Sequence, residues 1–91
     1  MKIGQIVFSK RGRDIGRAFV IMALEGEYVF LTDGNLRPLC KLKKKKAKHI
    51  QPTNKILDVY AQLPGGLKDA DIRKWLLPYT RHNVETNLTK L

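Results

Sequence analysis

Residues 3–24 of this 91-residue chain read IGQIVFSKRGRDIGRAFVIMAL, two strand-like segments joined by a polar loop. Residues 3–9 are rich in β-branched and aromatic side chains, which favours a strand. Residues 18–24 are apolar throughout, so we expect a second strand with both faces covered. Gly12 and Gly16 lie between them, where glycine can supply the positive φ of a tight loop. We expect the side chain of Asp14 to hold this loop through hydrogen bonds to the backbone.

Three further short strands are expected after this unit. Residues 28–32 are β-branched and aromatic, and Asp33-Gly34 marks a turn behind them. An irregular or edge strand is expected at about residues 35–42, then a basic loop, then a last strand at about residues 47–51. Five short strands separated by frequent turns predict a mainly β fold, a small and strongly bent barrel.

The C-terminal part predicts two short helices. Thr53 or Asn54 can cap a helix that runs to about Gln62. Asp69 can cap a second helix, which we expect to stop just before Pro78. The apolar stripe of this second helix is expected to pack on the barrel and consists of Ile72, Trp75, Leu76 and Tyr79.

These elements divide the chain into three parts. Residues 1–53 form the expected barrel, residues 54–79 a helical hook packed on it, and residues 80–91 a flexible tail without a clear period. A core of this size buries a modest area, so we expect marginal stability without a partner or a well-packed cap.

Positive charge is the strongest functional signal in the chain, whose formal net charge is +10. Residues 1–53 hold 12 basic and 4 acidic side chains, and residues 54–91 hold 6 and 4, so the charge belongs to the predicted barrel. We expect the basic residues to form two loop clusters. The first is Lys10, Arg11, Gly12, Arg13 and Arg17; the second is Arg37, Lys41, Lys43, Lys44, Lys45, Lys46, Lys48 and His49.

Such a charge density predicts a polyanionic partner. Lys and Arg that replace the counterions of nucleic acid gain free energy from counterion release. Glycines between arginines also let the backbone approach a phosphate closely. The alternative is a solvated surface without a ligand, and the coincidence of the net charge with a glycine-framed arginine cluster favours nucleic acid.

The aromatic residues of the strands leave two interpretations open. Exposed rings serve as stacking platforms in proteins that bind single strands, whereas rings on barrel strands are usually core. We expect Phe19 and Phe30 in the core, and we leave Tyr28 and Phe8 open between the two roles.

Other functional classes find little support in the sequence. No nucleophile-and-base set or carboxylate pair has a credible spacing, so we expect no enzyme and no cofactor. His49, His82 and the single cysteine, Cys40, lie too far apart for a metal site, and no metal is expected. Without a disulfide, a signal segment or an apolar run long enough for a bilayer, we expect a cytoplasmic protein with no membrane contact.

Two sequence patterns resemble a known family. Gly4-Gln5-Ile6-Val7, the basic loop, Gly12-x-x-x-Gly16-Arg17 and residues 18–24 resemble a KOW motif. Thr32-Asp33-Gly34 and the run from Lys43 to Thr53 resemble the archaeal and eukaryotic large-subunit ribosomal protein family numbered fourteen. Gln51 stands where that family usually has an acidic residue. The resemblance covers residues 2–53; the helical C-terminal part looks more like small bacterial KOW-domain RNA-binding proteins.

The resemblance implies an SH3-like barrel that binds RNA, most often ribosomal RNA, through the two basic clusters. We therefore expect a monomeric, non-catalytic RNA-binding protein associated with the ribosome. The alternative is a KOW-type module that docks on a ribosomal protein or a polymerase, with the helical hook as its docking surface. A third possibility is a basic DNA-binding protein.

Overall fold

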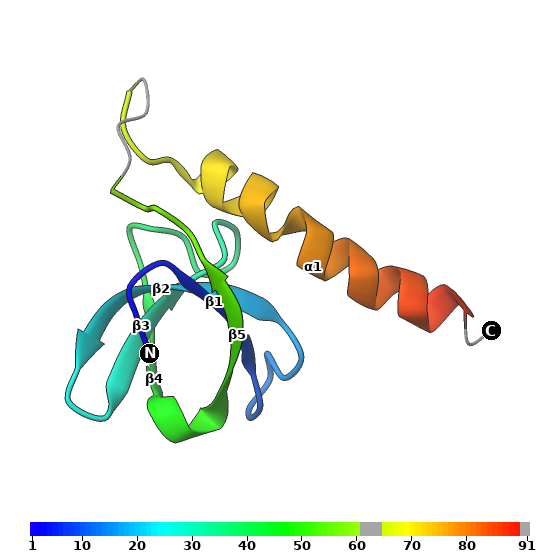
Figure 1. Cartoon of the computed structure of the whole chain (residues 1–91), viewed down its shortest axis with the longest axis horizontal. Coiled ribbons are helices and arrows are strands. Elements are labelled where there is room, and N and C mark those ends of the chain that lie inside the picture. Colours follow the sequence, from blue (N-terminus) through cyan, green and yellow to red (C-terminus); the bar gives the residue numbers. More distant parts are fainter. Residues whose placement is uncertain (61–64, 90–91) are drawn as a thin grey trace.

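A curved antiparallel sheet with one long helix beside it forms the protein (Figure 1). The computed structural model describes residues 1–60 and 65–89, with side chains up to residue 79. The elements are β1 (Gln5–Ser9), β2 (Ala18–Glu25), β3 (Tyr28–Thr32), β4 (Lys43–Lys46), the 3₁₀ turn η1 (Ala47–His49), β5 (Ile50–Ile56) and α1 (Asp69–Thr89).

The sheet has the strand order β4-β3-β2-β1-β5, and all neighbouring strands are antiparallel. β4 and β5 are therefore the two edge strands, although only η1 separates them in the sequence. Figure 1 shows how the sheet curls so that η1 links its two edges at the end opposite the helix. The register shifts near Ile21 in β2 and between Gln5 and Val7 in β1, and such irregularities bend a sheet.

Two apolar clusters lie on the two faces of this sheet. Successive side chains of a strand point to opposite faces, so β1 and β2 contribute to both clusters. The cluster inside the curl contains Val7, Phe19, Ile21, Val29, Leu31 and Ile50. The cluster beneath the helix contains Ile6, Ala18, Val20, Val59, Ile72 and Leu76. The expectation that β2 is covered on both faces is confirmed for Ala18 to Ile21, all of which are buried.

The expected strand at residues 35–42 is wrong. The side chain of Asp33 accepts hydrogen bonds from the backbone N–H groups of Asn35 (2.9 Å) and Arg37 (2.8 Å), which folds the segment into a loop. An aspartate that bonds its own following backbone competes with a strand ladder. The fourth strand is instead Lys43–Lys46, where we expected a basic loop, and the predicted strand at 47–51 begins as η1 and becomes β5 at Ile50.

The expected helix from residue 53 or 54 is wrong over its described part, because β5 continues to Ile56. The hydroxyl of Thr53, which we expected at a helix cap, donates to the carbonyl oxygen of Ile6 (2.7 Å). The side chain of Gln5 donates to the carbonyl oxygen of Thr53 (2.8 Å), so both contacts tie this residue to β1. β5 therefore runs past residue 53, where we placed the end of the expected barrel, and residues 61–62 lie outside the described part.

Within the described residues, one α-helix replaces the predicted pair, and it does not stop before Pro78. Proline removes one backbone donor, but its fixed φ is compatible with a helix, and α1 continues to Thr89 through the segment that we expected to be a tail. Its start also differs from the expectation: Lys68 precedes the helix, and Asp71 accepts a hydrogen bond from its N–H (2.9 Å). Asp69 instead accepts one from the N–H of Leu39 (2.7 Å).

The predicted apolar stripe of the helix is confirmed. Ile72 and Leu76 are buried, and Trp75 and Tyr79 pack against the same cluster half-buried. The Tyr79 ring lies 6.0 Å from that of Phe8 on β1 in a tilted arrangement, which gives Phe8 a packing role.

The loop after β3 meets the helix at Gly34, which is buried and has a φ of 72°. A Cβ at this position would collide with the carbonyl oxygen of Asp69 and lie 3.0 Å from the Cβ of Ile72. The guanidinium of Arg73 donates to the carbonyl oxygen of Gly34 (2.6 Å), which fixes the same contact from the helix side.

We expect Gly34→Ala to lower the free energy of unfolding by about 2–4 kcal/mol, because it adds a backbone collision to the strain of a positive φ. Gly26→Ala is the matched control, since Gly26 also has a positive φ (59°) but open space around it. Urea unfolding of both variants measures the difference. Equal losses would show that the helix contact at Gly34 contributes nothing.

Candidate nucleic-acid interface

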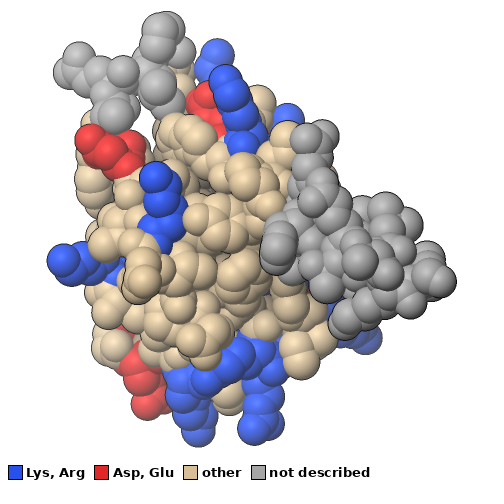
Figure 2. Space-filling view, turned by 45° about the vertical axis from the view of Figure 1, so that its right-hand side comes forward, with Lys and Arg blue, Asp and Glu red and all other residues tan. Residues whose placement is uncertain are grey.

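Basic side chains from distant parts of the sequence line one groove of about 400 Å³. We call this the cationic groove; its lining residues are Arg11, Gly12, Arg13, Asp14, Tyr28, Arg37, Lys43, Lys44, Lys45, Lys46 and His49. They come from the β1–β2 loop, the β3–β4 loop, β3, β4 and η1. Figure 2 shows Lys and Arg side chains gathered at the lower end of the molecule, the end at which Figure 1 places η1.

A smaller hollow of about 380 Å³ adjoins the groove and shares two of its residues. We call it the His49 pocket; it is lined by Lys10, Arg11, Lys48 and His49. The backbone N–H of Lys10 donates to the carbonyl oxygen of His49 (2.8 Å), so the β1–β2 loop and η1 are joined directly at this pocket.

The β1–β2 loop is a compact turn that presents its arginines outward. Gly12 and Gly16 have φ values of 86° and 82°, which confirms their predicted role. The N–H of Gly16 donates to the carbonyl oxygen of Ser9 (2.8 Å), and the N–H of Arg17 donates to the carbonyl oxygen of Asp14 (2.9 Å). The loop leaves Arg11 and Arg13 exposed.

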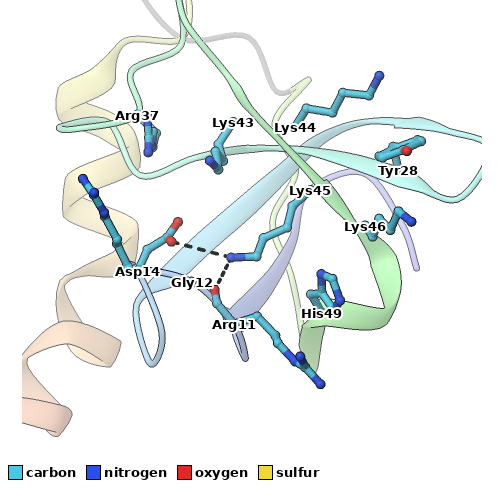
Figure 3. A pocket seen from close by; sticks show the side chains of 11 residues that line it. Arg11, Gly12, Asp14, Tyr28, Arg37, Lys43, Lys44, Lys45, Lys46 and His49 are labelled. Atoms are coloured by element: carbon cyan, nitrogen blue, oxygen red, sulfur yellow. Dashed lines mark hydrogen bonds and ion pairs between the residues drawn. The ribbon is translucent and has the colours of Figure 1, made fainter.

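The lysine run Lys43–Lys46 is a strand because it pairs with β3, in the register Leu31↔Lys43 to Tyr28↔Lys46. Alternation along a strand sends Lys43 and Lys45 to one face and Lys44 and Lys46 to the other. In Figure 3, Lys43 and Lys45 point toward the β1–β2 loop and Lys44 points away from it. Four residues of one type thus acquire different surroundings.

Lys45 is a structural residue at the centre of the groove. Its ammonium lies 3.6 Å from Oδ1 of Asp14, and both side chains are only 9% exposed. The ammonium also donates to Oγ of Ser9 (2.6 Å) and to the carbonyl oxygen of Arg11. Figure 3 shows the contacts of Lys45 with Asp14 and with Arg11, which join β4 to the loop. We expected the side chain of Asp14 to hold the loop through hydrogen bonds to the backbone. Instead, this side chain forms the ion pair with Lys45.

The second oxygen of Asp14, Oδ2, is buried and has no hydrogen-bond partner among the described residues. An ion pair that leaves one carboxylate oxygen unsatisfied offsets only part of the cost of removing both charges from water. Asp14 is also the only carboxylate that lines the groove as described, and its charge is already matched by Lys45.

The outer lysines of β4 make weaker contacts. The ammonium of Lys44 lies 4.4 Å from the centre of the Tyr28 ring, a cation–π contact at an exposed site. The ammonium of Lys46 lies 3.7 Å from Oε1 of Glu27, and these side chains are 42% and 69% exposed, so water screens the pair. Because both contacts are weak, either lysine can give up its present partner and bind another anion at a small cost in free energy.

Arg37 reaches the groove from the β3–β4 loop. Its N–H donates to the side chain of Asp33 (2.8 Å), and its carbonyl oxygen accepts from the Thr32 hydroxyl (2.8 Å). The backbone of Arg37 is therefore fixed at both ends, and its guanidinium carries no ion pair with the described carboxylates.

His49 is half-buried between the loop and β4. Desolvation lowers the pKa of its imidazole below the ordinary value, and the positive charges of Arg11, Lys48, Lys45 and Lys46 lower the pKa further. The imidazole is therefore predominantly neutral at neutral pH in the free protein.

The structure brings together most of the residues predicted for the site. All of them line the cationic groove or the His49 pocket except Arg17 and Lys41, which are exposed outside both. The groove adds Asp14 and Tyr28. Tyr28 was left open between core and surface; Phe19 is buried as expected, but Phe30, expected in the core, is half-buried. Neighbouring residues of a strand face opposite sides, so a buried Val29 implies that Tyr28 lies on the other, more exposed side. This alternation was the signal in the sequence that could have placed Tyr28.

The described residues hold no cluster of three or more His, Cys, Asp or Glu side chains suited to a metal ion. In the same part of the chain, no helix combines the length and apolar character that crossing a bilayer requires. A scan against models of known protein families and a search of curated proteins gave no match to this chain.

We expect Lys45→Met to destabilise the fold by about 3 kcal/mol, because it leaves the carboxylate of Asp14 buried without a counter-charge. Lys44→Met is the matched control and should cost less than about 1 kcal/mol, since it removes only an exposed cation–π contact. Chemical unfolding monitored by the fluorescence of Trp75 gives both values. Equal effects of the two substitutions would contradict a structural role for Lys45.

Proposed function

We propose that this chain is a non-catalytic RNA-binding protein whose cationic groove contacts the phosphate backbone of structured RNA. The observation that carries the proposal is the convergence of the β1–β2 loop and β4 on one groove with a single carboxylate. That carboxylate, Asp14, is neutralised internally by Lys45. Of the other cations of the groove, Lys46 makes only a screened ion pair with Glu27, and the rest make no ion pair with a described carboxylate.

The arginines and the lysines of the groove would contact RNA in different ways. Arg11, Arg13 and Arg37 carry planar guanidinium groups, which bind phosphate in a bidentate way or stack on bases. Lys43 and Lys44 act as mobile point charges that attract the backbone from a distance. This arrangement favours recognition of shape and charge over base sequence, as is usual for helical RNA, whose major groove is too narrow for side chains.

Fold and charge together support a KOW-type, SH3-like assignment with a role at ribosomal RNA. The sheet curls on itself and η1 connects the edge strands β4 and β5 along the chain, although these two strands do not pair and the sheet stays open. The glycine-framed loop that carries the resemblance forms one wall of the groove. The assignment explains why a small domain carries a net charge of +10.

The alternative, a helical hook that docks on a protein, needs the apolar stripe of the helix to be exposed. The stripe of Ile72, Trp75, Leu76 and Tyr79 packs on the sheet and is not offered to a partner. Contacts with a ribosomal protein or a polymerase would have to use another face, so RNA is the better proposal.

We expect the affinity for an RNA hairpin to fall steeply with salt, with a log–log slope of about −4 to −5, as six or so phosphate contacts imply. Fluorescence anisotropy between about 50 and 300 mM salt measures the slope. A duplex DNA competitor of the same length tests the preference for RNA. An affinity that does not change with salt would overturn the proposal.

A charge-matched pair of variants tests the groove itself. Arg11, Arg13, Lys43 and Lys44 replaced by Gln should weaken RNA binding by more than about tenfold, because four phosphate contacts are lost. The control replaces four exposed lysines outside the groove and the pocket by Gln: Lys2, Lys55, Lys68 and Lys74.

The control variant carries the same net charge as the groove variant and should lose less than about threefold in affinity. Equal losses of affinity in the two variants would show that only the net charge of the protein matters, and not the position of the charges in the groove. Sedimentation of both variants with ribosomal subunits then asks whether the RNA is ribosomal, since the groove variant should be released at lower salt than the control.

A further inference from the structure

The His49 pocket is a second concavity of the basic surface, beside the cationic groove. Lys10 and Arg11 line it from the β1–β2 loop, and Lys48 and His49 line it from η1. The hydrogen bond from Lys10 N–H to the carbonyl oxygen of His49 joins its walls. Lys45 of β4 donates to the carbonyl oxygen of Arg11 and so also fixes the part of the pocket that the β1–β2 loop forms.

All charged groups that line this pocket in the described part of the chain are positive. Farther out, Lys45 and Lys46 also act on His49 from β4, and each is paired with a carboxylate, Asp14 and Glu27 respectively. Neither carboxylate lines the pocket, so the imidazole faces an excess of cations from every element packed against it.

We infer that the His49 pocket holds one phosphate of the bound RNA, and that His49 takes up a proton from solvent when this phosphate enters. The inference rests on the proposed function and specifies how one part of that surface works. An imidazole beside three cations is neutral until an anion arrives; once protonated, it becomes a second N–H donor and a fourth positive charge.

The direction of the pH effect follows from the two states of His49. In the free protein its pKa is lowered by desolvation and by the cations around it. A phosphate favours the protonated imidazole and raises the pKa in the complex. At a pH between these two pKa values, the complex holds one more proton than the free protein does. The affinity for RNA therefore increases as the pH falls through this range.

Stability of the free protein changes in the opposite direction. The unfolded chain protonates His49 at a higher pH than the folded chain does, so the fold loses stability as the pH falls through the ordinary histidine range. Tighter binding at lower pH is therefore not a consequence of a more stable fold.

The test compares RNA affinity at about pH 5.5 and pH 8 for the unmodified protein and for His49→Gln, at constant salt. The RNA hairpin carries a 5′-hydroxyl, because a terminal phosphate would itself titrate in this range. We expect roughly three- to tenfold tighter binding at the lower pH, and loss of most of this difference in His49→Gln. His82→Gln, the other histidine of the chain, is the matched control and should retain the difference.

NMR titration of the imidazole gives an independent readout. The pKa of His49 should rise when the hairpin is added, and the same hairpin with a 5′-phosphate shows whether a terminal or an internal phosphate occupies the pocket. RNA binding that is independent of pH, with an unchanged pKa of His49, would overturn this inference and leave the proposed function intact. Failure to bind the hairpin at either pH would overturn both.

Discussion

The buried contact between Lys45 and Asp14 is the interaction on which the basic surface depends. It joins the edge strand β4 to the tip of the β1–β2 loop, with Ser9 and the carbonyl oxygen of Arg11 as further acceptors. These are the two walls of the cationic groove. Without this contact, two sets of like charges would face one another with no counter-charge between them.

The lysine run is therefore not a uniform patch. One of its members stabilises the fold, one lies over an aromatic ring, one makes a screened ion pair, and Lys43 faces the groove. Strand geometry alone produces this division, because a period of two places neighbouring lysines on opposite faces. The ion pair with Asp14 and the two further acceptors offset part of the cost of burying the ammonium of Lys45.

Local sequence predicted the first three strands, the helix stripe and most of the groove, because apolar periodicity and charge clusters are local signals. It failed where a distant partner decides the conformation. Lys43–Lys46 form a strand because β3 is beside them, and Thr53 extends β5 because its hydroxyl finds Ile6. The ion pair of Asp14 joins residues far apart in the sequence, which no spacing rule could have paired, and Pro78 did not end a helix already anchored by Ile72 and Leu76.

An edge made wholly of lysine also bears on how copies of this protein meet in solution. Unpaired backbone groups along an outer strand are a template for association with the sheet of another molecule, and repulsion between lysines opposes that association. The opposite edge, β5, contains Pro52, which offers no N–H to a neighbour. The positive strand thus discourages self-aggregation in a domain whose sheet leaves both edges unpaired.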